Sequence, residues 1–396
     1  MRSALSAGFV TTFTVFLFLT CTCPVQAALN SITDYQETES TTTLPAWFAP
    51  PGNHHRLYLD VYNVTDYYDF ETSSAAGFPD GTFLSDTLRP TFTLLWDERF
   101  RIQLGVIALK GYGESKGFGK VDPWIQLLWQ PKKPLSVIFG NLDTPHYFLP
   151  ALFYPLNYVR DSPKETGMQV KYDRRNWFDD LYFNYREQDT VDHNEKFDLG
   201  FVHHNAWKIL RFNYQSHWVH EGGELHSHAV HTMNDVAMAA GAGLHYDLTD
   251  NWALGWKYAY LHSHYRVDAS DPALLAHHNG DGTINEIYAR WKRIKLIAQS
   301  WHGHGYQHQG GDQLFTVDRM HLFSVRWDVL LSRDFSLLAE ATGYFVGTND
   351  EGIDKVMKSA IHVQAAWQFS IPIIEWTTPS ASPQGQPIPE RWDEGI

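Results

Sequence analysis

The chain has 396 residues and a formal net charge of −14, from 31 basic and 45 acidic side chains. No run of basic residues interrupts this acidic excess, which argues against a nucleic-acid partner. The length suffices for one large β-domain, and past the N-terminus no stretch approaches the roughly 20 apolar residues of a membrane-spanning helix.

The first 27 residues are typical of a secretory signal peptide. Arg2 supplies the charged start, residues 9–19 the apolar stretch and Val25-Gln26-Ala27 a small-residue cleavage site. A lipoprotein would instead use Cys21 or Cys23, but the residue before each is a threonine, which disfavours that alternative. Both cysteines lie in this segment, so the mature chain is expected to lack disulfides.

Residues 28–53 are polar and end in a proline-rich stretch, which predicts a flexible periplasmic segment. From residue 54 to residue 369 apolar and polar side chains alternate in segments of about ten residues, as in a transmembrane β-barrel. In residues 251–265, one face carries Leu254, Trp256, Tyr258 and Tyr260, and the other carries Ala253, Gly255, Lys257 and Ala259. We expect roughly sixteen such strands, an even number as in bacterial barrels.

The connections between these strands alternate between tight turns and long polar loops, which is the pattern of outer-membrane barrels with short periplasmic turns and long extracellular loops. Eight tryptophans lie within a few residues of a tight turn or of the end of the last strand and are expected to form the periplasmic aromatic girdle. These are Trp96, Trp129, Trp177, Trp207, Trp252, Trp291, Trp327 and Trp367. Residues 370–396 are rich in proline and are expected to form a loosely ordered periplasmic tail.

In this architecture the chain resembles bacterial outer-membrane β-barrels of the porin type. The strand ending in Trp367-Gln368-Phe369 is similar to the aromatic-ended last strand that the outer-membrane assembly machinery recognises, although here Phe369 is not the C-terminal residue. The resemblance implies an all-β fold in the bacterial cell outer membrane, surrounded by lipid and lipopolysaccharide. A homotrimer is an expectation of that family alone.

The loop spanning residues 141–166 contains many apolar side chains that should not remain in water. The porin resemblance implies that this loop folds into the lumen and constricts it. The charged candidates for the constriction are Asp143, Arg160, Asp161, Lys164 and Glu165. The alternative is that the loop packs on the barrel rim or in a subunit interface.

Successive side chains of a strand point alternately to lipid and to lumen, and this alternation assigns a set of basic side chains to the pore wall: Arg89, Arg101, Lys171, Arg186, Arg211, Lys257, Arg290 and Arg326. Fixed positive charge on a pore wall attracts anions, so we expect passive passage of small hydrophilic, anionic solutes. The alternative is that these groups pair with acids across strands and stiffen the barrel.

Histidine is unusually frequent, with 21 residues. His226, His228 and His231 are candidates for a metal site in an external loop, because neutral imidazole binds zinc, copper and nickel. Solvated loop histidines are the simpler interpretation. A barrel whose His-rich loops bind a metal or a surface polysaccharide without conduction is therefore the second functional hypothesis.

Some barrels are hydrolases that use Ser-His pairs, and His226-Ser227-His228 and His262-Ser263-His264 supply those residue types. Adjacent residues of a strand point to opposite faces and cannot pair, and the sequence contains no nucleophile elbow. We therefore expect a channel with no cofactor rather than an enzyme.

Overall fold

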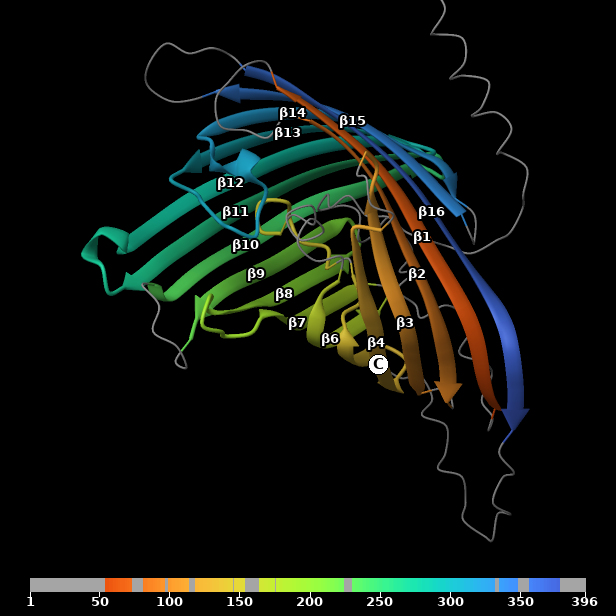
Figure 1. Cartoon of the computed structure of the whole chain (residues 1–396). Helices are drawn as coiled ribbons and strands as arrows, with labels where there is room; N and C mark the ends of the chain where they lie inside the picture. The colour runs from red at the N-terminus through yellow and green to blue at the C-terminus, as the bar shows by residue number, and fades with distance from the viewer. Residues whose placement is uncertain are drawn as a thin grey trace, which may run out of the picture.

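Sixteen strands in the described part of the chain close into one antiparallel β-barrel (Figure 1). The computed structural model describes residues 54–72, 81–96, 99–113, 118–144, 146–153, 164–174, 176–223, 230–331, 335–347 and 356–377. The predicted fold class is confirmed. The expected signal peptide and residues 28–53 lie outside the described residues.

The strands are β1 (His54–Thr72), β2 (Gly81–Trp96), β3 (Phe100–Gly111), β4 (Lys120–Lys132), β5 (Leu135–Asn141), β6 (Thr166–Arg174), β7 (Trp177–Glu187), β8 (Glu195–Trp207), β9 (Leu210–Gly222), β10 (Val230–Thr249), β11 (Trp252–Ala269), β12 (Ala276–Trp291), β13 (Ile294–His304), β14 (Arg319–Leu331), β15 (Phe335–Gly347) and β16 (Val356–Thr377). Two short 3₁₀ turns, Pro272–Leu274 and Gln313–Thr316, lie in the loops. No helix in these ranges is long and apolar enough to cross a membrane.

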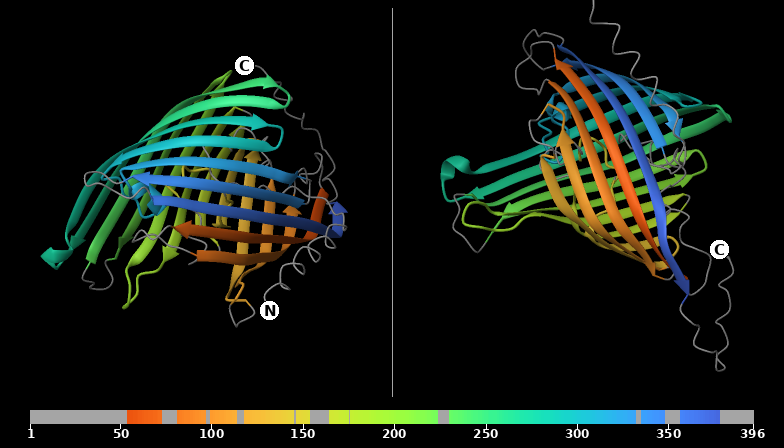
Figure 2. Two further views of the ribbon diagram at one scale, coloured as in Figure 1. Left: turned by 90° about the horizontal axis from the view of Figure 1, so that it is seen from above. Right: turned by 45° about the vertical axis from the view of Figure 1, so that its right-hand side comes forward.

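Each strand pairs with its neighbours in sequence, and β1 pairs with β16 to close the ring (Figure 2). The last strand continues to Thr377, so the boundary expected at residue 369 moves and the predicted tail begins later. Pro372 is accommodated because the register shifts between Leu57 and Tyr58, where a bulge removes the need for a ladder donor. Residues 378–396 are not among the described ones.

Connections of two or three residues alternate with longer ones, as the sequence predicts. The turn expected at Asn205 lies instead at residues 208–209, and Lys208 has φ 55°. Lys292 has φ 52° in the equivalent turn between β12 and β13. Lysine rarely adopts the left-handed backbone conformation that these two-residue hairpin turns require. Asparagine adopts it more readily, so the sequence favours a turn at Asn205.

The outer wall is apolar and the inner wall polar. Seven of the girdle tryptophans, from Trp96 to Trp327, are between 40% and 61% exposed on the outside near the short turns. Inward positions of the same strands carry buried polar groups such as Asp180, Gln215, Lys257 and Glu286. This arrangement satisfies the backbone internally and leaves apolar surface for lipid.

The main apolar core lies inside the lumen, against wall residues of strands between β7 and β15. It is built by two inward-folded segments that we call the luminal plug, namely residues 142–144 and 146–153 of the β5–β6 loop and residues 305–317 of the β13–β14 loop. Leu149, Leu152 and Phe315 of the plug pack with Tyr182 and Trp301 of the wall. Gly282 makes room for this core, because a Cβ there would lie 1.8 Å from Cη2 of Trp301.

Leu152 is fully buried in this core, whereas Leu254 is exposed on the lipid face. Leu152→Ala is expected to destabilise the protein by about 2–5 kcal/mol, because it leaves a cavity among plug and wall side chains. Unfolding in detergent with guanidinium would measure the change. Leu254→Ala removes the same atoms from the outer wall and serves as the matched control; equal destabilisation by both variants would contradict a plug core.

Candidate functional site

The first plug segment is anchored to the wall by backbone hydrogen bonds as well as by apolar packing. The Leu149 amide donates to Oε1 of Gln215 on β9 at 2.7 Å. The Tyr306 hydroxyl donates to the Ala151 carbonyl at 3.0 Å, which joins the two plug segments. The structure thus places this loop inside the lumen rather than on the rim.

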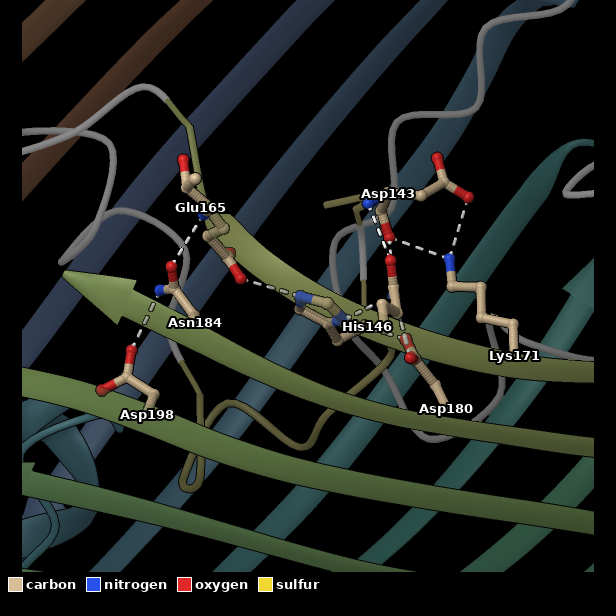
Figure 3. A network of polar contacts seen from close by, with 9 residues as sticks. Asp143, His146, Glu165, Lys171, Asp180, Asn184 and Asp198 are labelled. Atoms are coloured by element: carbon tan, nitrogen blue, oxygen red, sulfur yellow. Dashed lines mark hydrogen bonds and ion pairs between the residues drawn. The ribbon is translucent and has the colours of Figure 1, made fainter. Parts of the chain in front are cut away.

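A charged network fixes the same segment to β6 and β7 (Figure 3). The His146 ring bridges two carboxylates, with Nδ1 at 2.8 Å from Asp180 and Nε2 at 2.8 Å from Glu165. Gln169 donates to both oxygens of Asp180, at 2.9 and 3.0 Å. The Tyr182 ring stacks on His146 with centroids 3.8 Å apart.

Burial of the ring by itself would lower the pKa of His146, but the adjacent Glu165 and Asp180 outweigh it and raise the pKa to about 9. The imidazole is therefore cationic at neutral pH, and both its nitrogens are committed to carboxylates. A ring in this state cannot accept a proton as a general base. This network is consequently a structural anchor rather than a catalytic centre.

The five constriction candidates divide into three groups. Asp143 and Glu165 belong to the charged network, where Lys171 donates to Oδ2 of Asp143 at 3.0 Å. Lys164 donates to the Pro123 carbonyl at 3.1 Å, near the loop end of β4. Arg160 and Asp161 lie outside the described residues. A role for the five in narrowing a pore stays a prediction.

A second buried chain of polar groups anchors the other plug segment. His308 Nδ1 lies 2.9 Å from Oδ1 of Asp235 on β10, and His308 Nε2 lies 2.8 Å from Nδ1 of His217 on β9. The Gln309 amide donates to the other oxygen of Asp235 at 2.6 Å. Asp235, His308 and His217 have the residue types of a catalytic proton relay. Here Asp235 also accepts a hydrogen bond from the plug backbone at Gln309, which favours a role in holding the plug.

The basic pore-wall candidates mostly meet acids or rings. Their ion pairs are Lys171 with Asp143, Arg186 with Asp198 at 3.5 Å, Lys257 with Glu286 at 3.1 Å, Arg290 with Asp247 at 3.3 Å and Arg326 with Asp328 at 3.3 Å. Arg89 lies over the Tyr62 and Trp124 rings, Arg101 donates to Gln126, and Arg211 donates to the carbonyls of Lys208 and Leu210. These contacts favour the alternative in which the charges stiffen the barrel; anion selection stays a prediction.

Of the three metal-site candidates, His226 and His228 lie outside the described residues. His231 is exposed at a register shift between Val230 and Thr232. Within the described ranges, no group of three or more His, Asp or Glu side chains is arranged to hold a metal ion.

A different polar group stands on the outer wall, where side chains should face lipid. Oδ1 of Asp86 on β2 accepts hydrogen bonds from Nδ2 of Asn63 at 2.7 Å and from Oγ1 of Thr65 at 2.9 Å, both on β1. Lys110 is the partner of Asp86 in the β2–β3 register. We call Asn63, Thr65, Asp86 and Lys110 the outer-wall cluster.

Strand parity gives this cluster its outward direction. Phe92 on β2 and Leu104 and Val106 on β3 share the parity of Asp86 and Lys110, and all three are exposed on the outside. The opposite parity on β2 carries the buried, inward Thr91 and Thr93. An ionisable side chain on the lipid-facing wall is costly, and such groups commonly mark function.

The height of the cluster in the membrane follows from strand geometry. Asp86 lies ten residues along β2 from the girdle residue Trp96. With a rise of ~3.3 Å per residue and a tilt of ~40°, this places the carboxylate about 25 Å above the girdle, at the upper edge of the apolar band. The sugar headgroups of outer-leaflet lipids begin at this level.

A family model described as lipid A 3′-O-deacylase-type matches residues 49–345, which is most of the chain and nearly all of the barrel. The chain belongs to this family. No curated protein matches this lipid A deacylase-type chain. The expectation that the protein is not an enzyme is therefore wrong, because the family is named for a hydrolase. Its place is the outer membrane, as expected.

Solved structures similar to this deacylase-type chain match it at low identity. A triple mutant of the Rhodopseudomonas blastica porin is 12% identical, covers 79% of this chain and 100% of its own, and has a TM-score of 0.43. Acinetobacter baumannii OccAB1 is 8% identical over 80% of this chain and 97% of its own, with a TM-score of 0.47.

Sequence reasoning overlooked the outer-wall cluster, although a signal was present. Asn63, Thr65 and Asp86 fall on outward positions if the alternation of β1 and β2 is extended upward. One of the long loops expected from the sequence, near residues 66–86, would have included Asp86. The strands instead continue to Thr72 and from Gly81.

The network around His146 should make stability depend on alkaline pH. The folded-state pKa lies above the ordinary value of 6.5, so the contribution is complete below pH 6.5 and is lost as pH rises through about 9. The thermal unfolding midpoint is expected to fall over this interval, and His146→Gln should flatten the dependence. His203→Gln, at a half-buried His-Asp pair with Asp179, is the control and should leave the dependence unchanged; an unchanged slope in His146→Gln would contradict the assignment.

Proposed function

We propose that the protein is an outer-membrane esterase that removes an ester-linked acyl chain from lipid A in the outer leaflet, using the outer-wall cluster. The observation that carries the proposal is a hydrogen-bonded carboxylate facing lipid at the height of the headgroups, in a chain of a deacylase-type family. The plug networks are buried and hold their groups in structural contacts, which makes them poorer candidates for a bulky lipid substrate.

The geometry of the cluster suits acyl transfer. Thr65 Oγ1 already donates to Asp86, so the carboxylate can take its proton while the hydroxyl oxygen attacks the ester carbonyl carbon. The carbonyl oxygen becomes an oxyanion that the Lys110 ammonium stabilises, while the Asn63 amide donates to Asp86 and to the Thr87 carbonyl and holds the carboxylate in place. The carbon–oxygen bond to the sugar then breaks, and the sugar oxygen takes the proton from Asp86.

Water then hydrolyses the acyl-enzyme, and the proton transfers of the first half-reaction run in reverse. Asp86 accepts a proton from a water molecule that attacks the acyl-threonine ester, and the fatty acid leaves while Thr65 recovers its proton. The net reaction consumes one water and needs no redox partner. The substrate reaches the cluster laterally from the lipid phase, so the lumen need not be open.

Asp86→Asn removes the proton acceptor and is expected to lower kcat by about 10²–10⁴-fold, the usual contribution of a general base. Thr65→Val should abolish turnover and Thr65→Ser should retain it. Mass spectrometry of lipid A incubated with purified protein in detergent would measure release of the acyl chain.

A matched control exists on the same two strands. Asp69 on β1 accepts a hydrogen bond from Thr82 on β2 at 2.7 Å, on the same face but farther from the girdle. Asp69→Asn should leave deacylation intact. Comparable loss in Asp69→Asn and Asp86→Asn would refute the assigned site, and no acyl release by the parent protein would refute the esterase itself.

Passive solute passage is a second candidate, because the lumen beside β1 to β4 is lined by polar groups and not by the plug core. Asp60, Arg89, Thr93 and Arg101 lie on this side. If the protein conducts, planar bilayers should show channels with an anion-weighted reversal potential. Absence of conductance, or clear cation selectivity, would exclude the anion channel.

A further inference from the structure

A second polar area of the outer wall lies on β11 to β14, and the proposed reaction does not use it. Parity and register put six histidines and two arginines on its outward side: His262, His264, Arg266, His277, His302, His304, Arg319 and His321. We call these eight residues the histidine patch. We propose that the histidine patch binds the phosphate groups of a phosphorylated glycolipid in the outer leaflet.

The outward direction follows from neighbours of the same parity. On β11, Trp256, Tyr258 and Tyr260 precede His262 on the exposed side, while Ala259 and Leu261 are buried inward. On β14, Arg319 and His321 share the parity of the exposed Phe323 and Val325. The patch is therefore continuous with the lipid-facing wall.

The patch includes the level of the outer-wall cluster. His262 lies ten residues from Trp252 on β11, and Arg319 lies eight residues from Trp327 on β14. The same strand geometry puts them about 25 Å and about 20 Å above the girdle. Phosphates attached to the sugars of an outer-leaflet glycolipid lie at this level.

Other sectors of the wall are different at this height. On β7, β8 and β9 the outward positions are mainly aromatic, with Phe183, Phe197 and Trp218 packed at 5.2 and 5.4 Å between ring centroids and one histidine, His220, stacked on Phe197. A concentration of imidazole and guanidinium on one sector of an acidic protein is thus a local feature. It offers N–H donors and positive charge, which phosphate oxygens accept.

The carboxylates inside the patch are already engaged. Asp281 accepts from the Tyr260 hydroxyl and lies 2.8 Å from Nδ1 of His262. Asp268 pairs with Arg266 at 3.1 Å. His302 on β13 and Arg319 on β14 are cross-strand partners. His304 lies two residues farther along β13 on the same face, and these three residues form the basic end of the patch.

This end of the patch is separate from the outer-wall cluster. Arg319 pairs with Gly347 on β15, whereas the row that contains Thr65 crosses β15 at Leu337, ten residues away. With ~3.3 Å per residue along a strand and ~4.8 Å between strands, the two sites lie about 35 Å apart on the wall. The inference rests on the proposed function for the choice of lipid, and contacts with phosphate here would hold a glycolipid against a second sector of the wall.

Binding can be measured without hydrolysis in the full-length Asp86→Asn protein, embedded in phosphatidylcholine nanodiscs. The probes are bis-phosphorylated lipid A and the same lipid with its phosphates removed. The triple substitution His302→Gln, His304→Gln and Arg319→Gln is expected to weaken binding of the phosphorylated lipid by about tenfold, since each exposed charged contact contributes modestly. Binding of the dephosphorylated lipid should not change.

The control carries His203→Gln, Lys208→Gln and Lys292→Gln, which replace one histidine and two lysines near the periplasmic end by glutamine, and should bind both lipids normally. Equal affinities of parent and patch variant for the phosphorylated lipid would overturn the proposal. So would an equal loss for both lipids, or loss of parent binding in EDTA, which would indicate a bridging cation. Absence of acyl release by the unsubstituted protein would refute the esterase and leave this binding result intact.

Discussion

The structure depends on one constraint, the need of every backbone polar group in the membrane to find a partner within the protein. A closed ring of sixteen strands in the described ranges meets it, with β1 paired to β16 along their described lengths. Once the ring is closed, strand parity decides whether each side chain faces lipid or lumen. An outward Asp86 or Arg319 therefore stands out as a departure from this rule.

The lumen is organised by a second requirement, the removal of apolar loop side chains from water. The luminal plug meets it by packing Leu149, Leu152 and Phe315 against the wall. Its charged groups are satisfied at the same time, with His146 held between Glu165 and Asp180. Buried ionic groups in this protein thus position a loop, while the groups suited to chemistry remain on the outer surface.

The fold was largely predictable from sequence because period-two alternation is strong in segments such as residues 251–265. The inward direction of Lys257 and the outward direction of Tyr258 followed from it. Strand ends were less predictable, because Asn279-Gly280-Asp281-Gly282 has the composition of a turn. It lies within β12, where Gly280 fits against the backbone of Gly305 and Gly282 against Trp301. Those contacts come from a distant loop and leave no local signal.

The candidate site was less predictable for the same reason. Asn63 and Thr65 lie more than twenty residues before Asp86 in the sequence, on either side of a connection between strands. Only the β1–β2 register brings the three side chains together. The sequence does not predict enzymatic function, because its serine-histidine neighbours cannot pair within one strand. In a strand, side chains that act together lie on adjacent strands or two residues apart, never next to each other.

The hydrogen bond between Tyr306 and Ala151 joins residues 155 positions apart and lies within the ring of strands. Both segments belong to loops at the same end of the barrel, and their parent strands β5 and β13 are eight strands apart in the ring. The contact therefore connects distant sectors of the wall to each other through the lumen. Strand pairing restrains only neighbouring strands, so the plug adds a restraint against flattening of the barrel cross-section that the sheet by itself does not supply.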